Sequence, residues 1–169
     1  MYVDGTQGWV AVNSNDAATI SPAFVTASGG NATVTCGDFK THIFTGPGTF
    51  TVSCAGNPLG SSTVDYIVVA GGGGGHADGG AGAGGGGFRL SNSYSLPSPT
   101  MSPLSNPTGL SVTATGFPIT VGGGGAATTQ GSTSTFSTIS SAGGGASNGN
   151  TGWIVTGKQF ILVPLVVEV

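Results

Sequence analysis

Charge is what this sequence has least of. Lys, Arg, Asp and Glu together make up 5% of its 169 residues, whereas about 25% is usual in a soluble domain. The formal net charge is -3, and the only cations are Lys40, Arg89 and Lys158. Because nucleic-acid binding needs clustered Lys and Arg, we predict no nucleic-acid partner. A weakly charged protein tends to associate, so we also expect the chain to work inside an assembly.

Long apolar runs and helix signals are missing as well. The longest apolar stretch, Phe160 to Val169, is about half as long as a membrane helix needs and contains Pro164. The first residues lack the basic start and apolar stretch of a signal peptide. With 37% hydrophobic residues, the chain also lacks the composition of a disordered protein. We therefore expect a folded chain with no membrane insertion.

Residues for catalysis or metal binding are scarce. The tripeptide His76-Ala77-Asp78 interrupts a glycine tract, and no nucleophile-elbow sequence accompanies it, so we expect a solvated turn there. His42 lies in a predicted strand, where a hydrogen-bonded structural histidine is typical. The His and Cys spacings match no metal site. We predict no catalytic residue, no metal and no cofactor, so the chain is not expected to be an enzyme.

Two covalent modifications remain open. Cys36 and Cys54 each end an alternating segment, and they could form a disulfide if those two strands were neighbours. Two buried free thiols are the alternative. Asn31 begins the only Asn-x-Ser/Thr sequence, which would carry a glycan only if a glycosylating host secreted the chain.

Alternation of apolar and polar residues dominates the first part of the sequence. It predicts a hairpin in residues 1–14 and an antiparallel meander in residues 32–70. Residues 63–70 are more continuously apolar and favour a central strand. We therefore predict a small antiparallel β-sandwich-like domain in residues 1–70.

Glycine is the most abundant feature, at 34 residues, and three glycine runs each follow an apolar strand. A glycine-rich segment is normally a flexible linker. The alternative is an extended helix with three residues per turn, whose backbone groups pair with neighbouring segments. We favour packed strands, and thus an all-β chain without significant helix, in which a polyglycine II-like layered region follows the sandwich. The scaffold glycines are Gly71, Gly72, Gly73, Gly74, Gly75, Gly122, Gly123, Gly124, Gly125, Gly143, Gly144 and Gly145.

Composition divides the rest of the chain. The glycine-rich region covers residues 71–152, and within it Ser-, Thr- and Pro-rich stretches lie at 88–109 and 126–141. An apolar C-terminal strand is expected in residues 153–169.

Four segments, in order, resemble a known family. They are GDFKTHIFTGPGTFTVS (37–53), STVDYIVVAGGGGG (62–75), GFPITVGGGG (116–125) and FSTISSAGGG (136–145). They resemble the glycine-rich domain of phage tail-fibre and adhesin-type virion proteins, an arrangement frequent in marine phage sequences. The opening MYVDGTQGWVAV is similar to short strand pairs of tail-fibre proteins. The C-terminal GKQFILVPLVVEV departs from the family pattern.

The resemblance implies a non-enzymatic structural and host-attachment protein on a virion or extracellular appendage. It also implies that residues 88–109 and 126–141 are exposed loops. Its implied partners are further copies of itself, other virion fibre or tail proteins, and a host surface glycan or outer-membrane protein. Aromatic residues are enriched at binding hot spots, so side chains of the first long loop either contact a receptor or pack under the glycine layer. The candidates are Phe88, Arg89, Tyr94 and Met101.

Two other functions fit the composition. A self-assembling extracellular filament could polymerise by strand addition, through the apolar C-terminal strand or the N-terminal hairpin. An ice-binding protein would use flat arrays of glycine helices with Thr and Ser on one face.

Overall fold

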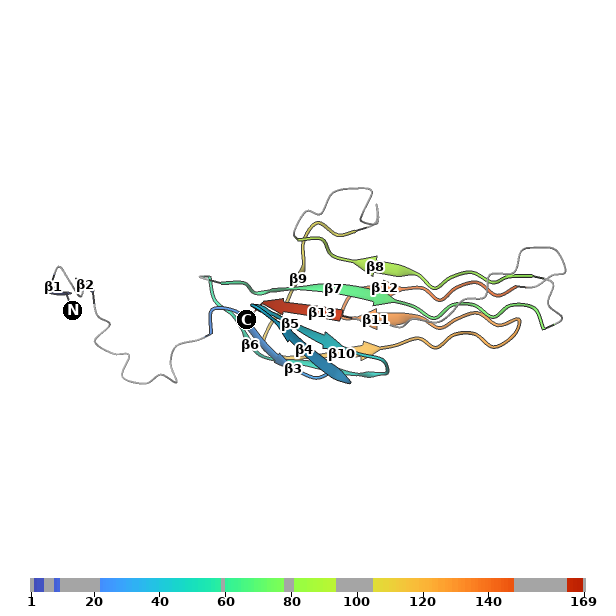
Figure 1. The fold of residues 1–169 in the computed structure, drawn as a ribbon, viewed down its shortest axis with the longest axis horizontal. Helices are drawn as coiled ribbons and strands as arrows, with labels where there is room; N and C mark the ends of the chain where they lie inside the picture. The colour runs from blue at the N-terminus through green and yellow to red at the C-terminus, as the bar shows by residue number, and fades with distance from the viewer. Residues whose placement is uncertain are drawn as a thin grey trace.

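The computed structural model describes residues 2–4, 8–9, 22–58, 60–77, 81–93, 105–147 and 164–168. Within these ranges the chain is all-β, with antiparallel sheets and no helix (Figure 1). Strands β1 (Tyr2–Asp4) and β2 (Gly8–Trp9) form a two-stranded antiparallel sheet of their own, in which Tyr2 is paired with Trp9. This sheet lies within the expected hairpin.

A five-stranded antiparallel sheet has the order β12-β11-β10-β6-β3. Its strands are β3 (Val25–Ser28), β6 (Gly48–Ala55), β10 (Gly116–Thr120), β11 (Ser134–Phe136) and β12 (Ile139–Ser141). The alternation seen in the sequence appears directly in β6, where Phe50 and Val52 are buried and Thr49, Thr51 and Ser53 are exposed.

A second sheet has six strands in the order β4-β5-β13-β7-β8, with β9 paired to another part of β7. Its strands are β4 (Ala32–Cys36), β5 (Phe39–Ile43), β7 (Thr63–Val69), β8 (Phe88–Leu90), β9 (Leu110–Ser111) and β13 (Pro164–Glu168). Strand β7 is central, because it pairs with β13 and also with β8 and β9. Strand β13 falls within the segment where a C-terminal apolar strand was expected.

One aromatic cluster joins the two sheets. The fully buried Phe136 of β11 makes edge-on contacts with Phe50 at 6.0 Å, Phe117 at 6.1 Å and Tyr66 at 6.5 Å between ring centroids. Tyr66 belongs to the six-stranded sheet and the other three belong to the five-stranded sheet. Edge-to-face aromatic pairs stabilise beyond their buried area, so Phe136 is the centre of the core.

His42 is a buried structural side chain on β5. Its Nδ1 donates a hydrogen bond to the carbonyl oxygen of Gly29 at 2.7 Å, and its ring packs edge-on against Phe50. Its Nε2 is buried without a hydrogen-bond partner among the described residues. Burial lowers the pKa of His42 below the usual 6.5, and the positive charge of Lys40 acts in the same direction.

The sheets do not separate at residue 70. Strands β10, β11 and β12 come from the glycine-rich part of the sequence, yet they continue the sheet that β6 and β3 begin. Residues 126–141, expected to form an exposed loop, instead contain a turn at 127–128, an extended segment and the hairpin β11–β12. Ser and Thr are typical of loops, but here Ser134 and Ser141 belong to short strands and are fully buried.

No disulfide joins the two cysteines. Cys36 is exposed on β4, and Cys54 is half-buried on β6. Strand β4 pairs with β5 in one sheet, whereas β6 pairs with β3 and β10 in the other. The strands are therefore not neighbours, which was the condition for a disulfide.

Candidate functional site: a bundle of glycine strands

Five extended segments project from one end of the sandwich (Figure 1). Residues 70–76 continue β7 outward and residues 81–87 lead back into β8. Residues 121–126 continue β10 and residues 129–133 lead back into β11. Residues 142–147 continue β12. None of them is a β-strand, but hydrogen bonds connect them laterally. We call these five segments the glycine bundle.

Residues 70–76 form the central segment of the bundle. Every third N–H group, from Ala70, Gly73 and His76, donates to a carbonyl of the 81–87 segment. The acceptors are Gly87 at 2.9 Å, Gly84 at 2.9 Å and Ala81 at 3.1 Å. The N–H groups of Gly71 and Gly74, again three residues apart, donate to Ser132 at 3.0 Å and Thr129 at 2.8 Å.

The carbonyl groups of the central segment follow the same period. The carbonyls of Gly72 and Gly75 accept from the N–H groups of Gly125 at 2.8 Å and Thr128 at 2.9 Å. Those of Gly71 and Gly74 accept from Gly144 at 2.8 Å and Ser147 at 3.1 Å. The central segment thus bonds to all four others at three-residue intervals, which is the repeat of a polyproline II-type helix.

The outer segments also bond to one another. Two N–H groups of the 81–87 segment donate to carbonyls of the 142–147 segment. The 129–133 segment donates one N–H group to the 142–147 segment and one to the 121–126 segment. These bonds are Gly84 to Gly145 at 2.9 Å, Gly87 to Ala142 at 2.8 Å, Gly131 to Gly144 at 2.9 Å and Ser132 to Gly123 at 2.9 Å. A polyproline II-type helix has no internal hydrogen bonds, so lateral pairing is what orders these segments.

Close approach of the backbones explains why glycine is required. A methyl group on Gly71 would overlap the carbonyl oxygen of Gly123, and one on Gly74 would overlap that of Ala126. Gly131 is constrained in the same way by the carbonyl oxygen of Gly71. By contrast, a methyl group on Gly85, Gly123 or Gly145 would have no heavy atom within 4 Å. Glycine is thus needed on the inner face of the bundle and is replaceable on the outer face.

The structure places the three predicted glycine runs together in this bundle. The 129–133 segment, Thr-Gln-Gly-Ser-Thr, was not predicted to join it, and Gly131 is its only glycine. Gly131 is buried while Gln130 and Ser132 are exposed. The only sequence feature that could have indicated this segment was Gly131, which faces the centre of the bundle. Composition alone cannot distinguish such a glycine from a loop glycine.

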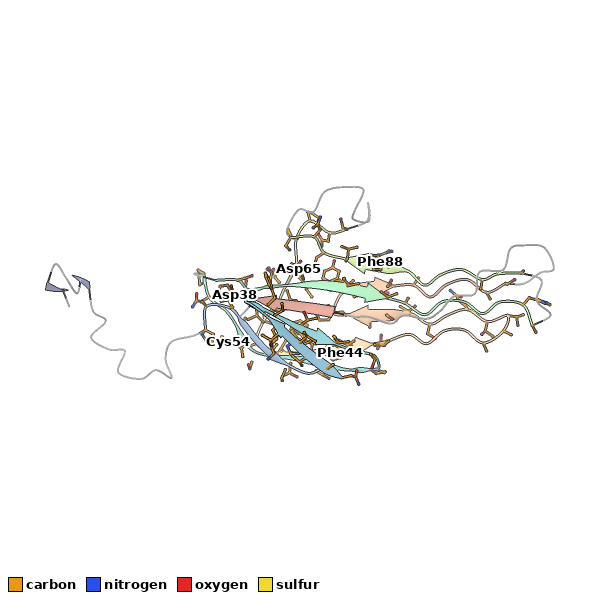
Figure 2. The ribbon with its side chains drawn as sticks, viewed as in Figure 1. Asp38, Phe44, Cys54, Asp65 and Phe88 are labelled. Atoms are coloured by element: carbon orange, nitrogen blue, oxygen red, sulfur yellow. The ribbon has the colours of Figure 1, made fainter. Side chains whose placement is uncertain are left out.

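Hydrogen bonds join the two described ends of the 88–109 stretch into a stem next to β8. Asn92 N–H donates to Asn106 at 2.7 Å, and Asn106 N–H donates to Leu90 at 2.9 Å. The hydroxyls of Ser91 and Ser93 both donate to Oδ1 of Asp65, which holds one arm of the stem against β7. Figure 2 shows Asp65 on the sandwich, away from the outer end of the glycine bundle.

The four receptor-contact candidates of this stretch separate into two groups. Phe88 is 43% exposed and Arg89 is half-buried, and both belong to β8, where they pair with Val69 and Val68. Tyr94 and Met101 lie outside the described residues.

The described residues contain no group of three His, Cys, Asp or Glu side chains that could hold a metal ion. His76 ends the central segment, and Asp78 lies outside the described residues. Asn31 is exposed, and its side-chain oxygen accepts from the N–H of Thr45 at 2.9 Å. In the described part of the chain, no helix has the length and apolarity to cross a membrane.

A family model described as a glycine-rich domain matches residues 44–159, which is more than half of the chain. The match includes most of the core strands and all five segments of the bundle. No curated protein and no solved structure matches the chain.

Proposed function

The chain belongs to the family of glycine-rich domains, and from this premise we propose that it is a non-enzymatic component of a phage tail fibre or similar virion appendage. The glycine bundle serves as a stiff scaffold that displays loops for attachment to the host surface. The observation that carries the proposal is the three-residue period of hydrogen bonds along residues 70–76.

Stiffness follows from backbone pairing. A free glycine-rich chain loses more conformational freedom on ordering than any other sequence. In this bundle the cost is offset by lateral hydrogen bonds to four neighbouring segments. Buried paired backbone gives a protease little unfolded chain to cleave, which suits a protein that works outside the cell.

Two surfaces are available for display. One is the outer turn of the bundle, where Ala127, Thr128, Thr129 and Gln130 are all exposed. The other is the 88–109 stretch, whose stem is held on β7 and β8. The outer turn is polar and uncharged, so it offers hydroxyl, amide and backbone groups to a partner. Such groups suit a host surface glycan, with an outer-membrane protein as the other partner class.

Direct binding tests this function. Fluorescently labelled protein is added to a panel of bacterial strains and to their purified surface polysaccharides. One variant replaces residues 127–130 with a Gly-Ser linker, and a second replaces residues 94–104 in the same way. We expect binding to a subset of strains that at least one of the two variants loses.

The control is Gly85→Ala, which leaves both display surfaces intact. If the protein binds no strain and instead slows ice growth, or if neither replacement changes binding, the proposed function is wrong. Hydrogen exchange of Gly71, Gly74 and Gly144 separately tests the scaffold, because paired amides exchange slowly and linker amides exchange fast.

A further inference from the structure

Strand β4 forms an unusually open edge of the six-stranded sheet. All five of its residues are exposed, and it pairs only with β5 among the described strands. Val34 at its centre is 52% exposed, and Phe39 at the start of β5 is 38% exposed. They are two of the three large hydrophobic side chains that are exposed among the described residues, the third being Phe88.

The usual protections of a sheet edge are missing from β4. Proteins shield edges with charged residues, proline, bulges or very short strands. Strands β8 and β12, at the ends of the two sheets, have three residues each, and the pairing of β3 with β6 contains a register shift. Strand β4 has five residues, ATVTC, without charge or proline, and its register with β5 is regular from Ala32–Ile43 to Cys36–Phe39.

The turn between β4 and β5 determines which backbone groups face outward. It has two residues, Gly37 and Asp38, and Gly37 has a φ of 57°. A two-residue hairpin turn makes its flanking pair, Cys36 and Phe39, hydrogen-bonded to each other. Bonded and non-bonded pairs alternate along antiparallel strands. The N–H and C=O groups of Ala32, Val34 and Cys36 therefore face β5, and those of Thr33 and Thr35 face the open edge.

We propose that two copies of this chain associate through β4, as antiparallel strands related by a two-fold axis at Val34. Thr33 of each copy then lies opposite Thr35 of the other. Each such pair exchanges two hydrogen bonds, so all the outward backbone groups of Thr33 and Thr35 are paired. The edge is self-complementary about its own centre, as a two-fold interface requires.

Side chains are compatible with this arrangement. The two Val34 residues form a non-hydrogen-bonded pair, the closer kind of antiparallel pair, with a Cα separation of about 4.5 Å. On the same face, Ala32 of one copy lies opposite Cys36 of the other. In each β5, Phe39 lies beside Cys36, Thr41 beside Val34 and Ile43 beside Ala32. The β4 side chains on this face therefore form one apolar row across both copies.

No like charges meet in this arrangement. Strand β4 is uncharged, and Lys40 pairs with Thr35 on the opposite face of the hairpin. The second copy therefore fits both the hydrogen bonds and the side chains of the edge. This inference does not depend on the proposed attachment function.

Sedimentation of the full chain across a concentration series tests the dimer. A few backbone bonds and one apolar row make a small interface, so we expect a reversible monomer–dimer equilibrium rather than a permanent dimer. Val34→Lys places two like charges opposite each other, and we expect it to weaken dimerisation about ten-fold or more. The matched control is Thr113→Lys, which adds the same charge at an exposed position away from β4 and should leave the dimer intact.

Cysteine crosslinking tests the register. In a Cys36→Ser background, Val34→Cys should give a covalent dimer under mild oxidation, because the two Cα atoms fall within disulfide range. The control Thr138→Cys, at an exposed turn position, should crosslink much more slowly. A chain that stays monomeric overturns the proposal, and so does a dimer insensitive to Val34→Lys. Growth into long filaments overturns it as well, because a two-fold interface closes on itself.

Discussion

The sandwich and the glycine bundle are two parts of one chain that are stabilised in opposite ways. In the sandwich, specificity comes from side chains, and Phe136 contacts aromatic rings from both sheets. In the bundle, the inner face is mostly glycine, and backbone N–H and C=O groups bond segment to segment. The comparison teaches that glycine, a weak residue inside a strand or helix, becomes the required residue where backbones themselves are the packing surface.

The largest expected effect is in the sandwich. Phe136→Ala removes the ring that joins the two sheets, and we expect it to lower the free energy of unfolding by about 3–5 kcal/mol. Chemical denaturation monitored by circular dichroism measures this loss of stability. The matched control is Phe88→Ala, because Phe88 is largely outside the core; a similar loss in both variants would show that Phe136 is not the centre of the core.

The next effect belongs to the bundle. Gly74→Ala places a methyl group on the carbonyl oxygen of Ala126, and we expect a loss of about 1–3 kcal/mol from the overpacked site. Gly123→Ala is the control, because its methyl group would face open space. We expect the control to be neutral or to gain up to about 1 kcal/mol through the unfolded state. Equal tolerance of both substitutions would mean that the segments are not packed as described.

A smaller effect is expected from pH and lies in the sandwich. Burial lowers the pKa of His42 in the folded chain. The hydrogen bond to Gly29 favours the protonated ring and opposes this shift, but burial has the larger effect. The unfolded chain therefore binds a proton at His42 more readily than the folded chain does. The contribution of neutral His42 to the free energy of unfolding is fully present above about pH 6.5 and decreases as the pH falls below that value. Thermal unfolding between pH 4 and 8 should show this decrease. His42→Asn should remove this part of the pH dependence, and an unchanged pH profile would contradict the assignment.

The smallest effect is at the outer turn of the bundle. Thr128 has a φ of 61°, a left-handed conformation that is strained for a β-branched residue. Asn adopts this conformation more readily, so Thr128→Asn should raise the free energy of unfolding by a few tenths to about 1 kcal/mol. Thr133→Asn is the control, since Thr133 is exposed and has no positive φ. A destabilised Thr128→Asn variant would indicate that the Thr128 side chain matters more than the strain.

The N-terminal half of the fold could be predicted because alternation of residues such as Phe50 and Val52 with Thr and Ser reports directly on a half-buried strand. The packing of the glycine runs was predicted from their placement after apolar strands. The joining of β10, β11 and β12 to β6 was not predicted, because their alternation covers only a few residues each. The role of Gly131 was also missed, because a single glycine among Ser and Thr is typical of loops.

The sequence by itself determined the local properties of the chain. These are its preference for β-structure, its low charge and the glycine runs that can adopt an extended three-residue repeat. These follow from each residue's own side chain, or the lack of one. Only the tertiary structure decided that residues 70–76 form the centre of the bundle, that the cysteines lie in different sheets and that β4 is left at an edge. Such outcomes depend on which segments meet across the fold, and glycine has no side chain to encode its partner.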